Sequence, residues 1–187
     1  MNSVFPLEVT LTITPTALQE KGSSATVKCT WTAKVDGVAV DPTAISINGV
    51  SVLGETSYTT TVTDTTTFKL TVTAEGRTAT ASKTLTFVYP IYTGFAPDTA
   101  FSESLISSLT KMALRTSLGG VSDSKTNTST SNYYWIVSPY KVTSVTTSGI
   151  NIIADFVQST TTYNNVTYYT YRLSKASAVG SFTFVIS

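Results

Sequence analysis

The sequence predicts an all-β fold, built as two β-sandwich modules in tandem, and three observations lead to this prediction. Apolar and polar residues alternate in many short segments, which is the period of a half-buried strand. Turn signals such as Asn-Gly and Asp-Gly separate these segments at short intervals. Ser and Thr make up about a third of the 187 residues and charged residues only 12%. Thr favours strands because it is branched at Cβ.

The first half of the chain reads as an Ig-like β-sandwich over residues 1–88. Leu7 to Thr14 alternates throughout, and residues 25–35 repeat the pattern with Cys29 and Trp31 on one face. Cys29 is therefore expected to be a small buried hydrophobic residue. Further strands are expected at 38–40, 44–47, 50–53, 58–63, 68–74 and 77–88. About seven short strands with regular turns are typical of an Ig-like sandwich. The Cys…Trp…Cys signature of antibody domains is missing.

A stiff joint is predicted at residues 88–94, between the two modules. Pro90 has no N–H for a sheet and holds Tyr89 extended, while Gly94 permits a turn that other residues resist. The alternative is a strand end and a turn inside one larger sandwich.

The second half reads as a C-terminal β-sandwich with one short helix over residues 89–187. A helix is expected within 98–109, capped by Asp98 or Ser102. Residues 111–118 fit a strand, 119–132 an exposed loop and 159–166 a polar hairpin loop. Strands are expected at 133–137, 142–147, 150–158, 166–173 and 182–186. Trp135 lies in the most apolar run and is expected in the core, and the last strand is expected to tuck the terminus into a sheet.

The titratable residues do not predict an enzyme. The chain has no histidine and one cysteine, so Ser–His and Cys–His systems, zinc clusters and an internal disulfide are excluded. The acidic residues show no pairing pattern, and Asp155, beside Phe156, is interpreted as a solvated strand position. We expect no catalytic, cofactor-binding or metal-binding residues and no cofactor.

Charge and hydropathy also exclude several partners. The net charge is +1 with the signs scattered, which argues against nucleic acid and against a membrane surface as partners. No apolar run approaches the ~18 residues that a membrane span needs. Met1–Pro6 has neither a basic nor an apolar signal region, so we expect a chain that is not marked for export.

Residues 86–187 carry a series of aromatic and glycine motifs. These are Val88–Gly94, Tyr133–Pro139, a Val-Thr-Ser-Val-Thr-Thr-Ser-Gly strand and turn, Tyr168–Ser174 and Gly180–Ser187. This part resembles a β-module of tail-fibre and other virion structural proteins of tailed phages, including phages of gut Bacteroidales. The resemblance implies a non-enzymatic structural component of a virion, assembled in the host cytoplasm. It would act as a fibre, decoration or connector. The implied partners are other virion proteins and the chain itself, as a homo-oligomer such as a trimer.

Two alternatives belong to other classes. The first is a receptor-binding module for bacterial surface polysaccharide, whose contact residues would be Tyr163, Asn164 and Asn165 at a predicted loop tip, together with Tyr134. An aromatic groove rimmed by Asn and Asp would favour this glycan reading, and a flat patch would favour assembly. The second is a fragment of a bacterial surface stalk, which would need a secretory signal or lipid anchor outside this sequence.

Overall fold

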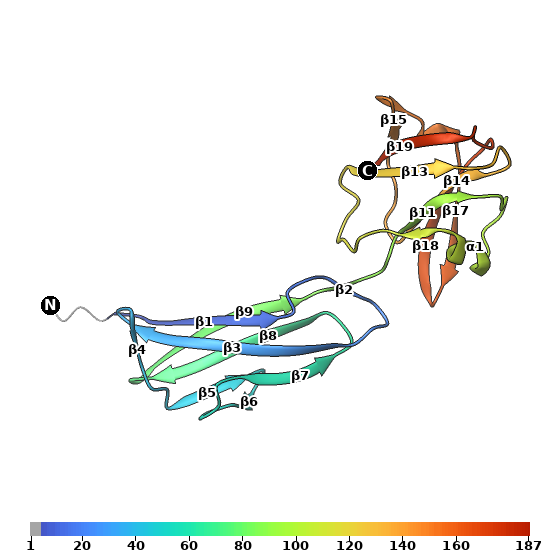
Figure 1. Cartoon of the computed structure of the whole chain (residues 1–187). Coiled ribbons are helices and arrows are strands. Elements are labelled where there is room, and N and C mark those ends of the chain that lie inside the picture. Colours follow the sequence, from blue (N-terminus) through green and yellow to red (C-terminus); the bar gives the residue numbers. More distant parts are fainter. Residues whose placement is uncertain (1–4) are drawn as a thin grey trace. The chain divides into compact units, whose positions relative to one another are not determined.

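The computed structural model of the protein describes residues 5–187 and confirms the all-β fold (Figure 1). Residues 1–4, on which the expectation about an export signal partly depends, lie outside the described residues. The chain divides into two compact units, unit 1 (Met1–Phe87) and unit 2 (Val88–Ser187). The boundary falls one residue before the division that the sequence predicts.

Unit 1 contains two antiparallel sheets with a shared apolar core. In one sheet β3 pairs with β1 along one edge, and with β4 and β7 along the other. The second sheet has the order β6-β5-β8-β9, and β2 pairs with β10. The bounds are β1 (Leu7–Thr14), β2 (Gln19–Glu20), β3 (Ala25–Val35), β4 (Val38–Ala39), β5 (Ala44–Ile47), β6 (Val50–Ser51), β7 (Tyr58–Val62), β8 (Thr66–Ala74), β9 (Arg77–Leu85) and β10 (Phe87–Val88).

The strands are divided as in a β-sandwich, with β1, β3 and β7 in one sheet and β5, β8 and β9 in the other. The alternating pattern explains it, because every second residue of β8 is buried, from Phe68 to Ala74. Cys29 is fully buried in the same core, as predicted. The Asp36–Gly37, Asn48–Gly49 and Glu75–Gly76 turns all have positive φ values, which two-residue hairpins of this hand require.

Paired hydroxyl groups lie on outward sheet faces in both units. Such groups face each other across neighbouring strands at 2.7–3.1 Å in the pairs Thr10–Thr32, Thr67–Thr84, Thr73–Thr78, Ser124–Thr183 and Thr126–Ser181. Each contact is a cross-strand pair of the kind that stabilises a sheet. The abundance of Thr and Ser therefore serves the solvent-facing sides of the sheets without adding charge.

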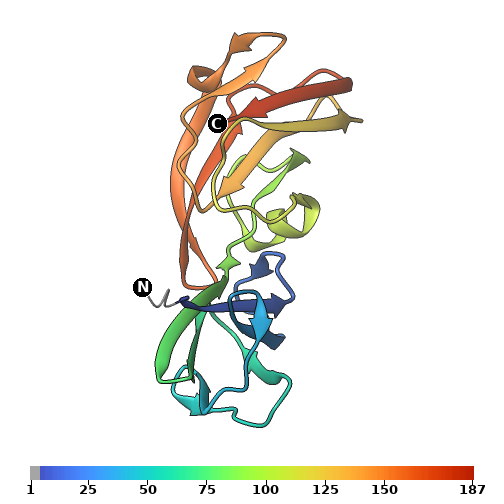
Figure 2. The ribbon, with the colours of Figure 1, turned by 90° about the vertical axis from the view of Figure 1, so that its left-hand side faces the viewer.

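Unit 2 also has two antiparallel sheets, ordered β12-β11-β14-β18-β17 and β13-β19-β15-β16. In Figure 2 the final strand β19 (red) lies beside β13 (yellow). Because β19 also pairs with β15, the prediction that the last strand is held inside a sheet is confirmed. The bounds are β11 (Tyr92–Ala96), α1 (Glu103–Ser108), β12 (Thr110–Lys111), β13 (Val121–Asn127), β14 (Tyr133–Ser138), β15 (Val145–Thr147), β16 (Ile150–Asn151), the 3-10 turn Ile153–Asp155, β17 (Phe156–Tyr163), β18 (Val166–Leu173) and β19 (Gly180–Ile186).

Strand β14 is buried on both faces. Tyr134 and Ile136 face a core that includes Phe184, while Trp135 and Val137 face a second cluster that includes residues of α1. Trp135 is buried, as predicted. The predicted helix and its cap are confirmed too, since Ser102 Oγ accepts a hydrogen bond from the N–H of Leu105 at 3.2 Å.

Part of the predicted joint belongs to a strand. Tyr92 to Gly94 lie in β11, in the interior of the five-stranded sheet. Gly94 has φ 152°, a backbone conformation that residues with a side chain rarely adopt. A Cβ there would lie at ordinary contact distance, 3.4 Å from Leu109 Cδ2, so the backbone conformation and not a lack of space favours glycine.

Four local predictions for unit 2 are wrong. Residues 111–118 add only the end of a two-residue strand, and the predicted loop 119–132 contains β13. The predicted strand 150–158 is interrupted by a 3-10 turn that holds Asp155. The predicted loop 159–166 is a continuation of two strands with a turn of two residues. A high content of Ser and Thr favours a loop, but in β13 and β17 these residues belong to strands.

Candidate functional site

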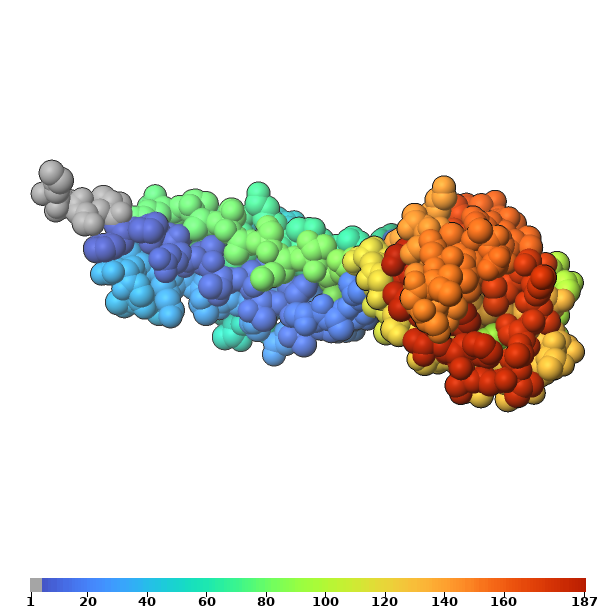
Figure 3. Space-filling view, turned by 90° about the horizontal axis from the view of Figure 1, so that it is seen from above, coloured from blue at the N-terminus to red at the C-terminus, as the bar shows by residue number. Residues whose placement is uncertain are grey.

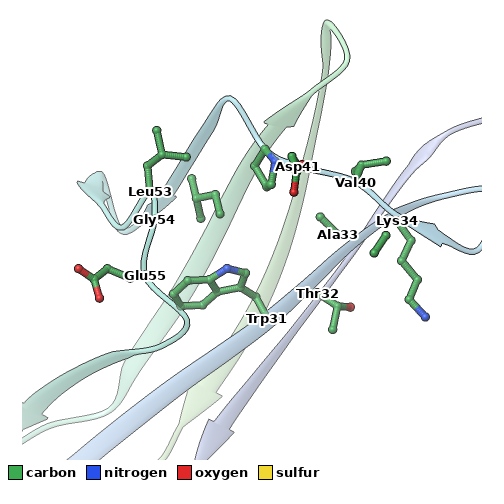
Figure 4. A pocket seen from close by; sticks show the side chains of 12 residues that line it. Trp31, Thr32, Ala33, Lys34, Val40, Asp41, Leu53, Gly54 and Glu55 are labelled. Carbon is green, nitrogen blue, oxygen red and sulfur yellow. The ribbon is translucent and has the colours of Figure 1, made fainter.

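An open groove on unit 1, which we call the Trp31 groove, is a candidate binding site. It has a volume of about 670 Å³. Trp31 and Ile45 supply its apolar surface together with Leu53, which is 52% exposed. Figure 4 shows the Trp31 indole projecting from β3 into this space, opposite Leu53 and Glu55.

The groove forms where β3 lacks a neighbouring strand. β7 pairs with β3 only over Ala25–Cys29, and β4 only over Lys34–Val35. Between them, the N–H of Val40 donates to the carbonyl of Ala33 at 3.2 Å. The edge around Trp31 is consequently left open to solvent, between the segments that carry Asp41 and Glu55.

The groove combines an aromatic face with polar groups. Asp41 and Glu55 supply carboxylates and Lys34 an ammonium group. The Trp31 indole N–H has no hydrogen-bond partner within residues 5–187, whereas the Trp135 indole donates to the carbonyl of Asp98 at 3.1 Å. An aromatic plane with nearby acceptors and a free donor suits a ligand that has both apolar faces and hydroxyl groups.

A second candidate surface is β17, the edge strand of the five-stranded sheet of unit 2. It pairs with β18 along its whole length, from Phe156 opposite Leu173 to Tyr163 opposite Val166. Its residues carry no charge, and Val157 is 50% exposed. In Figure 3 residues from the last part of the chain, coloured orange and red, occupy most of the visible face of unit 2.

The structure brings together three of the four residues predicted as a contact surface. Asn164 and Asn165 form the exposed turn between β17 and β18, with φ values of 49° and 60°. Tyr163 precedes them, but it is half-buried and its ring lies edge-on to Tyr168 at 6.2 Å between centroids. These residues form the tip of a hairpin with a two-residue turn.

The prediction is wrong for the fourth contact residue, Tyr134. Tyr134 is fully buried, so it belongs to no contact surface. Its hydroxyl donates to Asp123 Oδ2 at 2.6 Å, and Asp123 Oδ1 lies 3.1 Å from Lys125 Nζ. Burial, followed by the negative charge of Asp123, raises the pKa of Tyr134 well above its ordinary value. The cluster is a satisfied polar contact inside the core.

The sequence did not predict the exposed position of Trp31 or the full length of β17. The alternating pattern predicts that Trp31 lies on the buried face of its strand. Its partial exposure arises because the segments around Val40 and Leu53, which are distant in the sequence, leave the indole uncovered. The predicted strand 150–158 and the predicted loop 159–166 each include only part of β17. The available signal was the run of three threonines, Thr160 to Thr162, followed by Tyr163 and the Asn164–Asn165 turn.

The described residues show no arrangement for metal binding, since residues 5–187 contain no group of three or more His, Cys, Asp or Glu that could hold an ion. Burial raises the pKa of the Cys29 thiol, which makes it a poor nucleophile. Over the same range, no helix has the length and apolar character to cross a membrane. The chain matches no protein-family model, no curated protein and no solved structure.

Proposed function

We propose that the chain is a non-enzymatic structural component of a bacteriophage virion, a fibre, appendage, decoration or connector protein that acts through protein–protein contacts. The observation that carries the proposal is β17, a long and uncharged edge strand whose outer backbone groups are available to another protein. The hydroxyl-covered sheet faces are compatible with packing against neutral neighbours. The proposal that this assembly is a phage virion rests on the resemblance of residues 86–187 to phage virion modules.

This proposal predicts that the chain is part of assembled particles. An antibody raised against the purified protein is expected to label intact particles in electron micrographs. Mass spectrometry of gradient-purified particles is expected to detect the chain at a constant ratio to the major capsid protein. If the chain sediments only with soluble lysate proteins, the proposal is wrong.

A second candidate function is recognition of a bacterial surface polysaccharide, and the Trp31 groove is the observation that favours it. Sugar rings stack on an exposed indole, and their hydroxyl groups bond to carboxylates such as Asp41 and Glu55. Under this alternative, the partner is a glycan of the host surface, bound by unit 1 and not by the hairpin tip that the sequence indicated.

The test of this alternative is a glycan-binding assay with matched variants. If the groove binds a sugar, Trp31→Ala is expected to lose about fivefold or more in affinity, because stacking on an aromatic side chain contributes on the order of 1–3 kcal/mol. Asn165→Ala, at the hairpin tip, is expected to leave the affinity unchanged. Loss of binding in the Asn165 variant alone would indicate that the glycan binds at the hairpin tip. Retention of binding in both variants would exclude the Trp31 groove as the glycan site.

A further inference from the structure

The outer side of β17 has a defined backbone pattern. β17 and β18 are joined by a two-residue turn, so Tyr163 and Val166 form the closing pair, which exchanges backbone hydrogen bonds in such hairpins. Every second residue before Tyr163 therefore directs its backbone to β18. Gln158, Thr160 and Thr162 direct their N–H and C=O groups outward, where no backbone partner lies within residues 5–187.

β17 lacks the features that usually protect an edge strand. Natural edges carry charges, prolines or bulges, or they are very short. β9 carries Arg77 and Lys83 and β13 carries Asp123 and Lys125, while β12 and β16 have two residues each. β17 runs for eight residues, Phe-Val-Gln-Ser-Thr-Thr-Thr-Tyr, without any of these protections. Its length and neutrality point to a strand that is paired when the protein functions.

We propose that β17 pairs antiparallel with β17 of a second copy of this chain, about a two-fold axis at Thr160. The two five-stranded sheets then become one continuous sheet. The axis falls on a residue whose backbone groups point outward, so Thr160 exchanges hydrogen bonds with itself across the axis. This inference rests on the proposed function and extends it, because it identifies a second copy of the chain as a partner that binds β17.

The side chains of β17 are self-complementary in this register. Gln158 meets Thr162 of the second copy and Ser159 meets Thr161, so amide and hydroxyl groups face hydroxyl groups. The chain already uses such contacts, as between Ser159 and Thr170 at 2.6 Å. Val157, 50% exposed in one copy, meets the Tyr163 ring of the other. Aromatic and β-branched residues are favourable cross-strand pairs, and no like charges oppose each other.

β7 offers the nearest alternative edge, since Tyr58–Val62 (Tyr-Thr-Thr-Thr-Val) is also uncharged. It is shorter than β17, and its two apolar ends, Tyr58 and Val62, already pack on the core of unit 1. Self-pairing there would cover little additional apolar surface. The comparison favours β17 and also supplies a control position, Thr60.

Cysteine cross-linking of the full chain tests both the partner and the register. Thr160→Cys places two thiols on Cα atoms about 5.5 Å apart, within disulfide range. Thr162→Cys is a matched control, because its thiols would lie roughly 13 Å apart along the strands. Native Cys29 is fully buried and does not interfere. Under mild oxidation, Thr160→Cys is expected to form a covalent dimer at least about tenfold faster than Thr162→Cys or Thr60→Cys. Equal rates for the three variants, or fastest linkage at Thr60, would overturn the proposal.

Light scattering on the protein without introduced cysteines gives an independent measurement. A mass of two chains is expected, falling to one in Thr160→Lys, where like charges meet across the axis, but not in Thr80→Lys on the exposed side of β9. Circular dichroism establishes that both variants are folded. A monomer at the highest soluble concentration, or a trimer, would overturn the proposal. A dimer that is absent from particles would leave this inference standing and overturn the proposed function, and a monomer found in particles would do the reverse.

Discussion

At the scale of single residues, the buried Tyr134 is the most informative side chain. Its hydroxyl and the Asp123 carboxylate face each other inside unit 2, and Lys125 neutralises the carboxylate from the solvent side. The Tyr134 ring stacks on Phe184 with centroids 3.9 Å apart. A buried carboxylate is tolerated only when its oxygens are paired. The residue therefore joins the two sheets of unit 2 by an aromatic contact and a polar one.

Removal of the Tyr134 hydroxyl is expected to destabilise the protein. Tyr134→Phe keeps the ring but deprives the buried Asp123 of a donor, so the free energy of unfolding is expected to fall by about 1–3 kcal/mol. Urea denaturation followed by circular dichroism measures this change. Tyr133→Phe, on the half-buried neighbouring residue, is the control and is expected to cost less than about 0.5 kcal/mol. Equal losses in both variants would contradict the role given to Tyr134.

The same residue predicts an alkaline limit on stability. The raised pKa of Tyr134 means that the folded protein favours the neutral phenol. Its contribution to stability is fully present below the unfolded-state pKa of about 10 and is lost as the pH rises above that value towards the folded-state pKa. Denaturation midpoints are expected to fall above about pH 10, less steeply in Tyr134→Phe than in the native protein. Parallel curves for the two proteins would argue against this assignment.

At the scale of elements, the β17–β18 hairpin depends on its turn. Asn164 and Asn165 both have positive φ values, which asparagine tolerates and glycine adopts at no steric cost. Asn165→Gly gives the Asn-Gly sequence that such turns prefer and is expected to raise the stability by less than about 1 kcal/mol, because the relief at positive φ is partly offset by the greater freedom of glycine in the unfolded chain. Asn165→Ala is expected to lower it by about 1 kcal/mol. Thermal denaturation ranks the three proteins, and the reverse order would show that the turn differs from this description.

Strands with one face in the core and one in water were predictable from their alternation, whereas β13, built mostly from hydroxyl and amide residues, was not. The alternation in β1, β3 and β5 places their bounds correctly, because one face meets the core and the other meets water. β13 was predicted as a loop, since its residues are mostly Ser, Thr, Asn and Asp. Its buried Asn127 is held by the carbonyls of Ser177 and Ala178, about fifty residues later in the chain. Such distant partners leave no local pattern in a sequence, and the same holds for the Trp31 groove.

At the scale of the whole molecule, each unit has its own buried core and one tryptophan, Trp31 or Trp135. We expect the two units to unfold separately. Trp31→Phe leaves fluorescence from unit 2 alone, and Trp135→Phe leaves fluorescence from unit 1 alone.

Leu70→Ala, a fully buried residue of unit 1, provides the perturbation for this measurement. It is expected to cost about 2–5 kcal/mol. The urea transition reported by Trp31 is expected to move, and the one reported by Trp135 is expected to stay. Ile136→Ala, in the core of unit 2, is the converse control. A joint shift of both transitions would mean that the chain unfolds as one cooperative body.

The paired hydroxyl groups on the outward sheet faces have a consequence for the environment that the protein tolerates. Dissolved ions screen charge–charge attraction beyond a Debye length of ~8 Å at physiological ionic strength, but they have little effect on hydrogen bonds between neutral groups. The chain also has no histidine, the side chain whose ordinary charge change falls between about pH 5 and 8. Both units are therefore expected to keep their stability from dilute buffer to brine and from mildly acidic to mildly alkaline media.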